Sequence, residues 1–526
     1  MPERGQVNEL DGTSTRRSGT SLPSRYRRLT TNKEVIISIL VIDIGSTAIR
    51  TAVVRPDGKV EARHQRPVVA HRPGPGLVEV DGAALAHAAL DAARSTLSQA
   101  GPVQGVGVTN QRGTTAVWDA VGGEPVGPFL SWQDLRTAGT CLELQAEGLR
   151  LAPNESATKL AWLLDTYDPE RRRDLRFGTL DSWVVWQLSE GQAHLTDPSN
   201  AGVSGLLPTE QLLAGTASLS WDPARLERFR VPATCMPTIV ASSAVVAEAS
   251  ALAGSPPICG IVGDQQASLF GQGCVKAGDA KATFGTGAFL DVNVGAQPPA
   301  FGAFGKRGEK GCFPIIAWER ADQLTWGAEA IMLSAGSALD WLVTDLELLH
   351  DAAESAEVAS RCARTGDVFF VPATLGIGTP TWDFGARSLL IGITSGTGRP
   401  EVVRAVLEGI AQRGADLLES AEADSGLEIA RLRVDGGMSA NPVFAQALAD
   451  ACRRPVEISS ELEATTLGAG LLAGLAVRTW SSEAEAASTC RPRSVIEPTG
   501  PDHRDRWAEA RSRAEKWIPE LSALSF

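Results

Sequence analysis

Two apolar, β-branched runs near the start of the chain are separated by a short polar tip. The segment starts at Val35 and reads VIISILVIDIGSTAIRTAVV, and only residues 43–47 interrupt its strand-like character. Two apolar runs of strand length around a polar segment predict a β-hairpin. Asp57 and Gly58 then give a two-residue turn signal, which predicts a third strand near residues 59–66.

The tip of this predicted hairpin carries residues suited to phosphate chemistry. Asp43 ends the first strand, Gly45 lets another group approach the backbone, and Ser46 and Thr47 add hydroxyls beside free N–H groups. This combination suits a phosphate group and its magnesium ion. A polar hairpin tip that binds nothing is the alternative.

The same pattern returns about 240 residues later. Residues 281–294 again predict a strand, a turn and a strand, with Gly285, Thr286 and Gly287 at the tip. Two such tips facing each other across a cleft would hold nucleotide phosphates from both sides. The sequence contains neither a Walker A motif nor a complete G-x-G-x-x-G, so P-loop and ordinary Rossmann folds lose their main support.

A third nucleotide element follows a predicted buried strand that ends in Asp435. Gly436 and Gly437 allow a tight turn with room for a flat ring, and Ser439 and Asn441 can cap the next helix. An adenosine could lie against this turn. An ordinary connection between a strand and a helix is the alternative.

Composition narrows the class of protein. The chain has 526 residues, 43% hydrophobic and 21% charged, and a net charge of −13. At roughly 150 residues per domain, this length allows two large domains with sizeable cores. The acidic balance argues against nucleic acid or an anionic membrane surface as partner. The longest apolar run, residues 35–42, is far short of the roughly 20 residues that cross a bilayer.

These features predict an acidic protein of the cytoplasm with no membrane partner. The eight cysteines are widely spaced without a Cys-x-x-Cys pair, which favours reduced thiols over zinc or redox chemistry. Residues 1–34 are rich in Ser, Thr, Gly and Arg and have little apolar content. They are predicted to form a disordered N-terminal extension.

Several longer strings carry a resemblance to a known family. With the two hairpins and the Asp-Gly-Gly turn in this order, the chain from about Ile36 to Trp480 resembles the FGGY carbohydrate kinases, and especially their glycerol-phosphorylating members. The strings are Gly107–Arg112, Trp132–Thr137, Phe177–Trp183, Thr196–Ala201, Gly263–Gly271, Gly376–Asp383 and Ala423–Gly426.

The resemblance implies an α/β fold with two actin-like (ribonuclease H-like) ATPase domains and a cleft between them. The expected N-terminal domain spans residues 35–256, the C-terminal domain 257–485, and a helical tail 486–526. The implied activity is an ATP- and Mg²⁺-dependent transfer of phosphate to an alcohol group of a small polyol or sugar. Relatives often form dimers or tetramers, which leaves a homo-oligomer open.

The resemblance also assigns the catalytic chemistry. Asp264 matches the aspartate that accepts the proton of the attacking hydroxyl. A helix N-cap is the alternative role for Asp264, since Asp is favoured there. Asp43 matches the aspartate that organises the metal ion, directly or through water.

The nucleotide positions follow from the same resemblance. Arg50 could instead pair with a nearby acid on the surface. Asp340 stands where these relatives usually carry Gln, and it can accept a hydrogen bond but not donate one. The predicted nucleotide-binding residues are Ser46, Thr47, Arg50, Thr286, Gly336, Asp340, Gly437 and Asn441.

The acceptor pocket departs from these relatives. The glutamate that usually follows the pocket arginine is Gly113, the usual tyrosine is Asn154, and a usual aromatic is Leu77. Smaller side chains and two lost polar anchors predict an acceptor larger than glycerol. Glycerol itself remains the alternative, with water or a neighbouring side chain replacing the lost anchors. The predicted substrate-binding residues are Arg112, Gly113, Trp132, Asn154, Asp264, Gln265 and Phe289.

A non-enzymatic actin-like protein that uses ATP only as a switch is the competing class. A base at Asp264 with an acceptor site at Arg112 and Trp132 favours the kinase, because a pure switch needs neither.

Overall fold

The computed structural model describes residues 38–300, 307–501 and 503–524. The predicted N-terminal extension, residues 1–34, lies outside the described residues. By its internal contacts, the chain from Ile37 onward forms one unit. In the described part of the chain, every helix is too short or too polar to cross a membrane.

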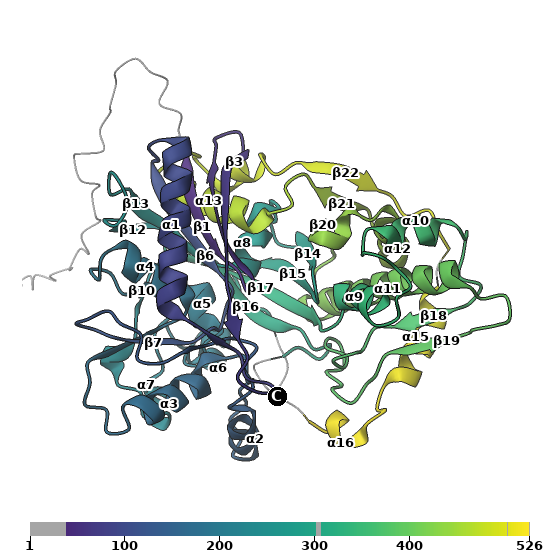
Figure 1. Ribbon diagram of the computed structural model, residues 1–526, viewed down its shortest axis with the longest axis horizontal. Helices are drawn as coiled ribbons and strands as arrows, with labels where there is room; N and C mark the ends of the chain where they lie inside the picture. The colour runs from purple at the N-terminus through teal and green to yellow at the C-terminus, as the bar shows by residue number, and fades with distance from the viewer. Residues whose placement is uncertain (1–37, 301–306, 502, 525–526) are drawn as a thin grey trace, which may run out of the picture. The chain divides into compact units, whose positions relative to one another are not determined.

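The first sheet is built from the predicted hairpin and later strands. Its six strands run in the order β12-β13-β6-β1-β2-β3 (Figure 1). β1, β6 and β13 are parallel, and β2, β3 and β12 pair antiparallel. The bounds are β1 Ile39–Ile44, β2 Ala48–Val54, β3 Val60–Pro67, β6 Gly105–Asn110, β12 Ser243–Glu248 and β13 Pro257–Gly263.

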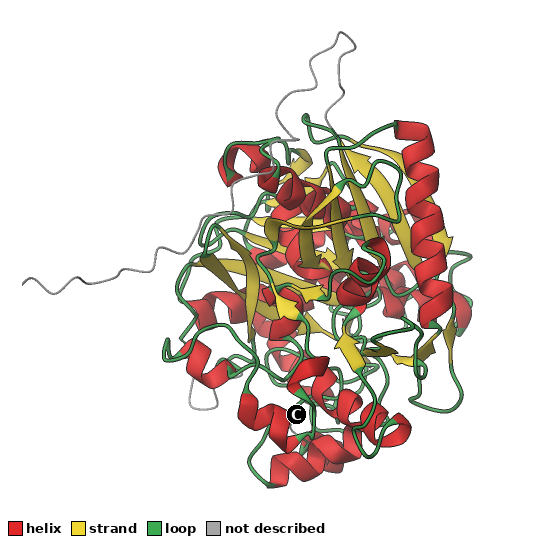
Figure 2. Ribbon diagram, turned by 90° about the vertical axis from the view of Figure 1, so that its left-hand side faces the viewer, coloured by secondary structure: helices red, strands yellow, loops and turns green. Residues whose placement is uncertain are grey.

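Helices cover both faces of this sheet. In β1, Leu40 and Ile42 pack with residues of α1 (Gly82–Ala100), while Ile39 and Val41 face α13 (Ala464–Ala476). This period of two, apolar on both sides, is expected of a strand buried on both faces. Figure 2 shows helices in red on either side of the yellow strands.

Glycines allow close contact between helices and strands. A Cβ at Gly260 would lie 2.8 Å from the Cβ of Ala473. A Cβ at Gly468 of α13 would collide with the carbonyl oxygen of Ala267 in α8 (Asp264–Gly271). Gly468 therefore allows α13 to pack closely against α8.

The second sheet repeats the plan with seven strands, in the order β16-β17-β15-β14-β20-β21-β22. An antiparallel meander leads again into parallel strands, here β14, β20 and β21. The bounds are β14 Ala280–Phe284, β15 Ala288–Gly295, β16 Phe313–Arg320, β17 Gln323–Met332, β20 Leu432–Asp435, β21 Val456–Ser459 and β22 Pro492–Ile496.

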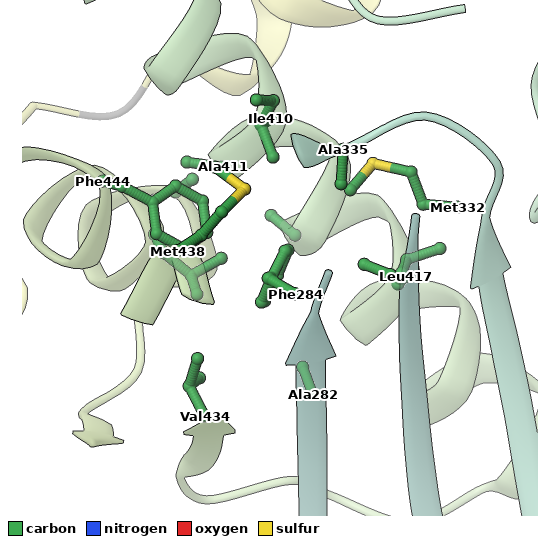
Figure 3. Packing of buried hydrophobic residues seen from close by; sticks show 14 of the residues in the cluster. Ala282, Phe284, Met332, Ala335, Ile410, Ala411, Leu417, Val434, Met438 and Phe444 are labelled. Atoms are coloured by element: carbon green, nitrogen blue, oxygen red, sulfur yellow. The ribbon is translucent and has the colours of Figure 1, made fainter. Parts of the chain in front are cut away.

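The core of this second half surrounds Phe284. Its ring packs edge-on against Phe444 at a centroid distance of 4.9 Å. Met438 and Ile410 belong to the same cluster (Figure 3). Ile410 comes from α11 (Arg399–Ser425) and Phe444 from α12 (Pro442–Cys452).

Two mixed sheets with covering helices confirm the predicted α/β fold of two related domains. β13 pairs with β6 in the first sheet, although the predicted boundary places residue 257 at the start of the second domain. The exact division of the chain stays a prediction. The segment 486–526 contains the helices α15 (Arg504–Ala514) and α16 (Pro519–Ser522), but it also supplies β22, which pairs antiparallel with β21.

The other elements connect and flank these two sheets. They are β4 Ala70–His71, β5 Glu79–Val80, β7 Ala116–Asp119, β8 Phe129–Leu130, α2 Ala138–Ala146, α3 Ser156–Tyr167, β9 Leu175–Gly178, α4 Leu180–Leu188, β10 Leu195–Thr196, α5 Pro198–Gly202, α6 Thr209–Leu213, α7 Pro223–Arg228, η2 Ala233–Cys235, β11 Thr238–Ile239, α9 Gly336–Thr344, α10 Glu354–Ser360, β18 Phe369–Val371, β19 Leu389–Ile391, η3 Gly437–Ala440 and α14 Glu483–Ala487.

Candidate active site

The first hairpin tip joins β1 to β2 as the sequence predicts. The Gly45 N–H donates to the carbonyl oxygen of Ala48 at 3.0 Å, and Ser46 and Thr47 are exposed. Asp43 lies one residue before the end of β1 and is buried. Exposed hydroxyls beside a buried carboxylate leave the tip open to a ligand on one side.

Asp43 lies in an acidic environment. Burial raises its pKa to about 7, Arg50 opposes this shift, and Asp264 and Glu463 add to it. Nη1 of Arg50 lies 3.8 Å from Oδ2 of Asp43, and its Nε lies 3.4 Å from Oε1 of Glu463. Arg50 therefore pairs with Asp43 and Glu463, and its contact with phosphate stays a prediction.

The second hairpin tip, between β14 and β15, rests on the start of α9. The carbonyl oxygen of Thr286 accepts from the N–H groups of Ala335 and Ser337, at 2.9 and 3.2 Å. The Gly336 N–H donates to the carbonyl oxygen of Gly285, which would lie only 2.6 Å from a Cβ at position 336. The tip and α9 thus form one unit around two of the predicted nucleotide residues, Thr286 and Gly336.

The Asp-Gly-Gly turn follows β20 and lies beside the second tip. Gly436 has a φ of 86° and approaches the main chain of Phe284, the last residue of β14. A Cβ at Gly437 would meet no atom within 4 Å. Asn441 caps α12, where its Oδ1 accepts from the N–H groups of Val443 and Phe444.

Two of the predicted nucleotide-binding residues, Asn441 and Asp340, differ in the surroundings of their side chains. Nδ2 of Asn441 donates to Oγ of Ser355 at 3.0 Å, so its amide is engaged within the protein. Asp340 is exposed on α9, four residues after Gly336. The structure brings Thr286, Gly336 and the Gly436 turn together, whereas Asn441 lies behind that turn as a helix cap.

Asp264 is the first residue of α8 and directly follows β13. Gly263 is the N-cap, so the alternative role of Asp264 as a helix cap is wrong. The carboxylate accepts the Gln265 N–H at 2.9 Å and lies 3.6 Å from Nε of Arg112. Burial raises the pKa of Asp264, while Arg112 opposes this shift.

Arg112 and Asp264 meet because β6 and β13 are adjacent parallel strands, whose carboxyl ends lie at one edge of the sheet. Nη2 of Arg112 donates to Oε2 of Glu329 at 2.6 Å. Within the described residues, its buried Nη1 has no hydrogen-bond acceptor. Trp132 donates from Nε1 to Oε1 of Gln111 at 3.1 Å, which fixes its ring.

Gly113 and Asn154 meet through the backbone. Gly113 has a φ of 74°, and a Cβ there would lie 2.5 Å from the carbonyl oxygen of Asn154 and 3.5 Å from the Cβ of Trp132. The space beside Gly113 is therefore taken up by the chain itself. Phe289 lies on β15, next to the second tip.

Sequence reasoning missed several charged residues beneath these groups. Glu329, Lys281 and Asp291 are buried beside the acceptor candidates, and Lys159 of α3 donates to the carbonyl oxygens of Gly113, Ser131 and Asn154 at 3.0–3.3 Å. Isolated charges inside apolar strand patterns are the signal that could have revealed Lys281 and Glu329.

Comparison with known proteins identifies the class. Residues 38–271 match the N-terminal domain of the FGGY family of carbohydrate kinases, and residues 280–477 match its C-terminal domain. The chain belongs to this family of phosphotransferases, which act on hydroxyl groups and use ATP as a substrate. This assignment supports the enzyme over the ATP switch.

Named relatives are glycerol kinases. The chain is 37% identical to that of Symbiobacterium thermophilum, over 92% of this chain and 99% of the relative. It is 38% identical to that of Dechloromonas aromatica, over 91% and 98%. Plasmodium falciparum glycerol kinase, solved with ADP, has a TM-score of 0.82 at 26% identity and covers 93% of this chain and 99% of its own. A xylulose kinase from Brucella ovis shares the fold, with a TM-score of 0.79 at 22% identity over 93% and 100%.

Proposed function

We propose that this protein transfers the terminal phosphoryl group of ATP to a hydroxyl group of a small polyol or sugar. One observation carries the proposal: the carboxylate of Asp264 lies 3.6 Å from Nε of Arg112 and raises the pKa of Asp43, where the ends of β1, β6 and β13 meet. This arrangement provides a base, a hydroxyl-binding cation and a phosphate tip at one edge of a sheet.

The residues have different roles in the proposed reaction. Asp264 accepts the proton of the attacking hydroxyl, and its raised pKa makes it a better base than an exposed Asp. The free Nη1 of Arg112 donates to an acceptor hydroxyl, because in the described residues it has no other partner. Trp132 and Phe289 provide apolar walls. The proposed nucleotide contacts remain Ser46, Thr47, Arg50, Thr286, Gly336, Asp340, Gly437 and Asn441.

The residues present also fit Mg²⁺. Among the described residues no cluster of three or more acidic, His or Cys side chains could hold a metal alone. Magnesium, however, is usually held by one or two carboxylates, waters and substrate phosphates. Asp43, with its pKa raised by burial beside Asp264, supplies such a carboxylate. When bound, the ion would neutralise phosphate charge.

For the acceptor, we propose a polyol or sugar larger than glycerol. The positive φ at Gly113 and the close approach of the Asn154 carbonyl fit this loop to glycine and not to a glutamate. Because the main chain fills the space at Gly113, any additional room comes from the exposed Asn154 and from Leu77. The loss of a buried hydroxyl partner costs about 1–3 kcal/mol, which disfavours glycerol.

Glycerol is the second candidate acceptor, favoured by the glycerol kinases at 37–38% identity over more than nine-tenths of the chain. The cytoplasm remains the predicted location, and a homo-oligomer remains open.

A kinase assay decides between the two acceptors. Purified protein is given ATP, Mg²⁺ and each member of a panel of three- to six-carbon polyols and ketoses, and acceptor-dependent ADP release is measured. We expect the highest kcat/KM on an acceptor of four or more carbons. The variant Asn154→Tyr is the matched control, because it should lower that preference. The highest kcat/KM on glycerol would overturn the larger acceptor, and ADP release independent of every acceptor would overturn the kinase.

A further inference from the structure

Three charged side chains form a row across neighbouring strands of the second sheet. Lys281 of β14 is the Cα partner of Asp291 of β15, and Asp291 is the Cα partner of Glu329 of β17. All three are buried. Nζ of Lys281 lies 2.7 Å from Oδ2 of Asp291. Directly paired residues on adjacent strands point to the same face of a sheet, so this charged row is continuous.

Each end of the charged row reaches a residue proposed to touch the acceptor. At one end, Oε2 of Glu329 accepts from Nη2 of Arg112 at 2.6 Å. At the other end, Nζ of Lys281 donates to Oε1 of Gln265 at 2.6 Å. Arg112 lies two residues after the end of β6, and Gln265 is the second residue of α8, so both lie outside the second sheet. The row therefore contacts two groups that lie on different elements.

Burying the three side chains of the charged row in a core is energetically unfavourable. Taking charges out of water costs several kcal/mol per ion even after relaxation, and well-packed apolar residues in the same place are often as stable or more so. Its neighbours on these strands, Ala282, Leu290 and Ala330, are apolar and fully buried. Stability alone therefore gives no reason for three charges at these positions.

The orientation of Arg112 and Gln265 gives a reason for the buried charges. An Arg guanidinium held by a carboxylate on one side keeps a fixed plane, so its remaining N–H groups point in a defined direction. Gln265 is fixed in the same way, since an ammonium on its Oε1 determines which amide atom faces away from Lys281. With Oε1 engaged, the amide nitrogen of Gln265 is the atom that can face an acceptor oxygen.

We propose that the charged row of Lys281, Asp291 and Glu329 positions the acceptor-binding groups, with Glu329 orienting Arg112 and Lys281 orienting Gln265. Asp291 links the two by holding Lys281 in the row. The three residues act through Arg112 and Gln265 and do not touch the acceptor themselves. This inference rests on the proposed kinase function and deepens it, because it makes acceptor selection depend on the second sheet.

The charges around Glu329 support this role. Burial raises its pKa, Arg112 opposes the shift, and Asp291 adds to it. The charged groups that act on Glu329 are Arg112, Asp291 and Lys281. Arg112 is therefore the main group that favours the charged form of Glu329, and the two depend on each other.

The test measures steady-state kinetics of Glu329→Gln and Glu329→Ala on the best acceptor of the panel. We expect kcat/KM for the acceptor to fall about 10- to 100-fold in Glu329→Ala, since small misplacements of positioning groups have effects of this size. Glu329→Gln should recover part of the loss, because its amide oxygen still accepts from Arg112. The loss should include a rise in KM for the acceptor while KM for ATP stays within about twofold, whereas loss of folding would lower kcat and leave both KM values unchanged.

Glu457 provides the matched control. It is also a buried acid in the second sheet, on β21, and pairs with Arg431 and Arg433 at 2.9 and 3.1 Å. Glu457→Gln should leave acceptor kinetics unchanged. A double variant, Glu329→Ala with Arg112→Ala, should be no worse than Arg112→Ala alone, because Glu329 acts through Arg112.

The outcomes separate the inference from the function beneath it. If wild-type protein phosphorylates an acceptor and Glu329→Ala matches it in acceptor kcat/KM, the positioning role is wrong and the kinase stands. If acceptor and ATP parameters fall together by the same factor, the row is structural and the inference is overturned. If wild-type protein shows no acceptor-dependent ADP release, the proposed function fails and this inference fails with it.

Discussion

On the proposed acceptor side of the site, Arg112 is largely buried and paired with Glu329 and Asp264, whereas on the proposed nucleotide side Thr286 is exposed and is held through its main chain. On the acceptor side, ion pairs between side chains fix the orientation of Arg112. The proposed nucleotide side gains its shape from glycine turns whose main-chain hydrogen bonds leave Ser46, Thr47 and Thr286 exposed.

This difference has a consequence for substitutions. In a buried site, removing one member of a charged pair is strongly unfavourable, because the remaining charge is left uncompensated. An exposed tip held by main-chain bonds tolerates a change of side chain but not a change of backbone path. Acceptor-side variants should therefore change turnover most, and nucleotide-side variants should change KM for ATP.

The largest effect is expected for Asp264→Asn. Asn has nearly the same shape but cannot take the proton of the acceptor hydroxyl, and a positioned general base contributes about 10²- to 10⁴-fold. We expect kcat to fall by that range while KM for ATP stays nearly constant, measured by acceptor-dependent ADP release. Asp279→Asn, in the turn where Asp279 accepts the Lys276 N–H, is the control. More than a tenth of wild-type kcat in Asp264→Asn would exclude Asp264 as the base.

Lys159→Met should have the next largest effect. Three carbonyl oxygens would lose their donor, each at about 1–3 kcal/mol, so we expect the free energy of unfolding to fall by about 3 kcal/mol or more. Because two of these carbonyls belong to Gly113 and Asn154, KM for the acceptor should rise as well. Urea unfolding and acceptor kinetics provide the measurements, and an unchanged midpoint would show that water replaces the ammonium.

The shifted pKa of Lys159 predicts how the stability difference between wild type and Lys159→Met changes with pH. Burial lowers the pKa of Lys159 from 10.5 to about 7. Between these values the unfolded chain binds more protons at this site, so the contribution of Lys159 to stability increases as the pH rises from about 7 toward 10.5. Below about 7 both states are protonated and this contribution is constant. The difference in Tm between wild type and Lys159→Met should grow over that window, and a constant difference would contradict the shift.

The two sides also differ in how far the sequence predicts them. The hairpin tips and the Asp-Gly-Gly turn follow local patterns of strand, glycine and polar residue, and the structure has each of these elements where it was expected, whereas Asp264 was singled out by the family resemblance. The bond between Arg112 and Glu329 joins residues 217 positions apart, and no local pattern encodes such a pair. For Asn441 the local pattern predicted a helix cap, which the structure displays, while its nucleotide contact was implied by the family resemblance and stays a prediction.

Gly336→Ala tests the nucleotide side through its backbone. The added Cβ would lie 2.6 Å from the carbonyl oxygen of Gly285, so the second tip must move away from α9. Overpacking of this kind costs about 1–3 kcal/mol, and we expect KM for ATP to rise about tenfold with KM for the acceptor unchanged. Gly139→Ala, where a Cβ would meet no atom within 4 Å, is the control. An equal rise in both KM values would show that the tip also shapes the acceptor side.

Asp340→Gln is expected to have the smallest effect and the opposite direction. Asp340 is exposed on α9, four residues after Gly336, and an amide at this position can donate to a nucleotide group as well as accept from one. One neutral hydrogen bond contributes about 0.5–1.5 kcal/mol, so KM for ATP should fall about two- to tenfold. Removing one acid from beside a polyanionic ligand acts in the same direction. Asp340→Asn separates the two contributions, because it removes the charge but its shorter amide does not extend as far. Equal KM values in Asp340→Gln and Asp340→Asn would assign the gain to charge, and a KM unchanged in both would place the adenosine away from this face of α9.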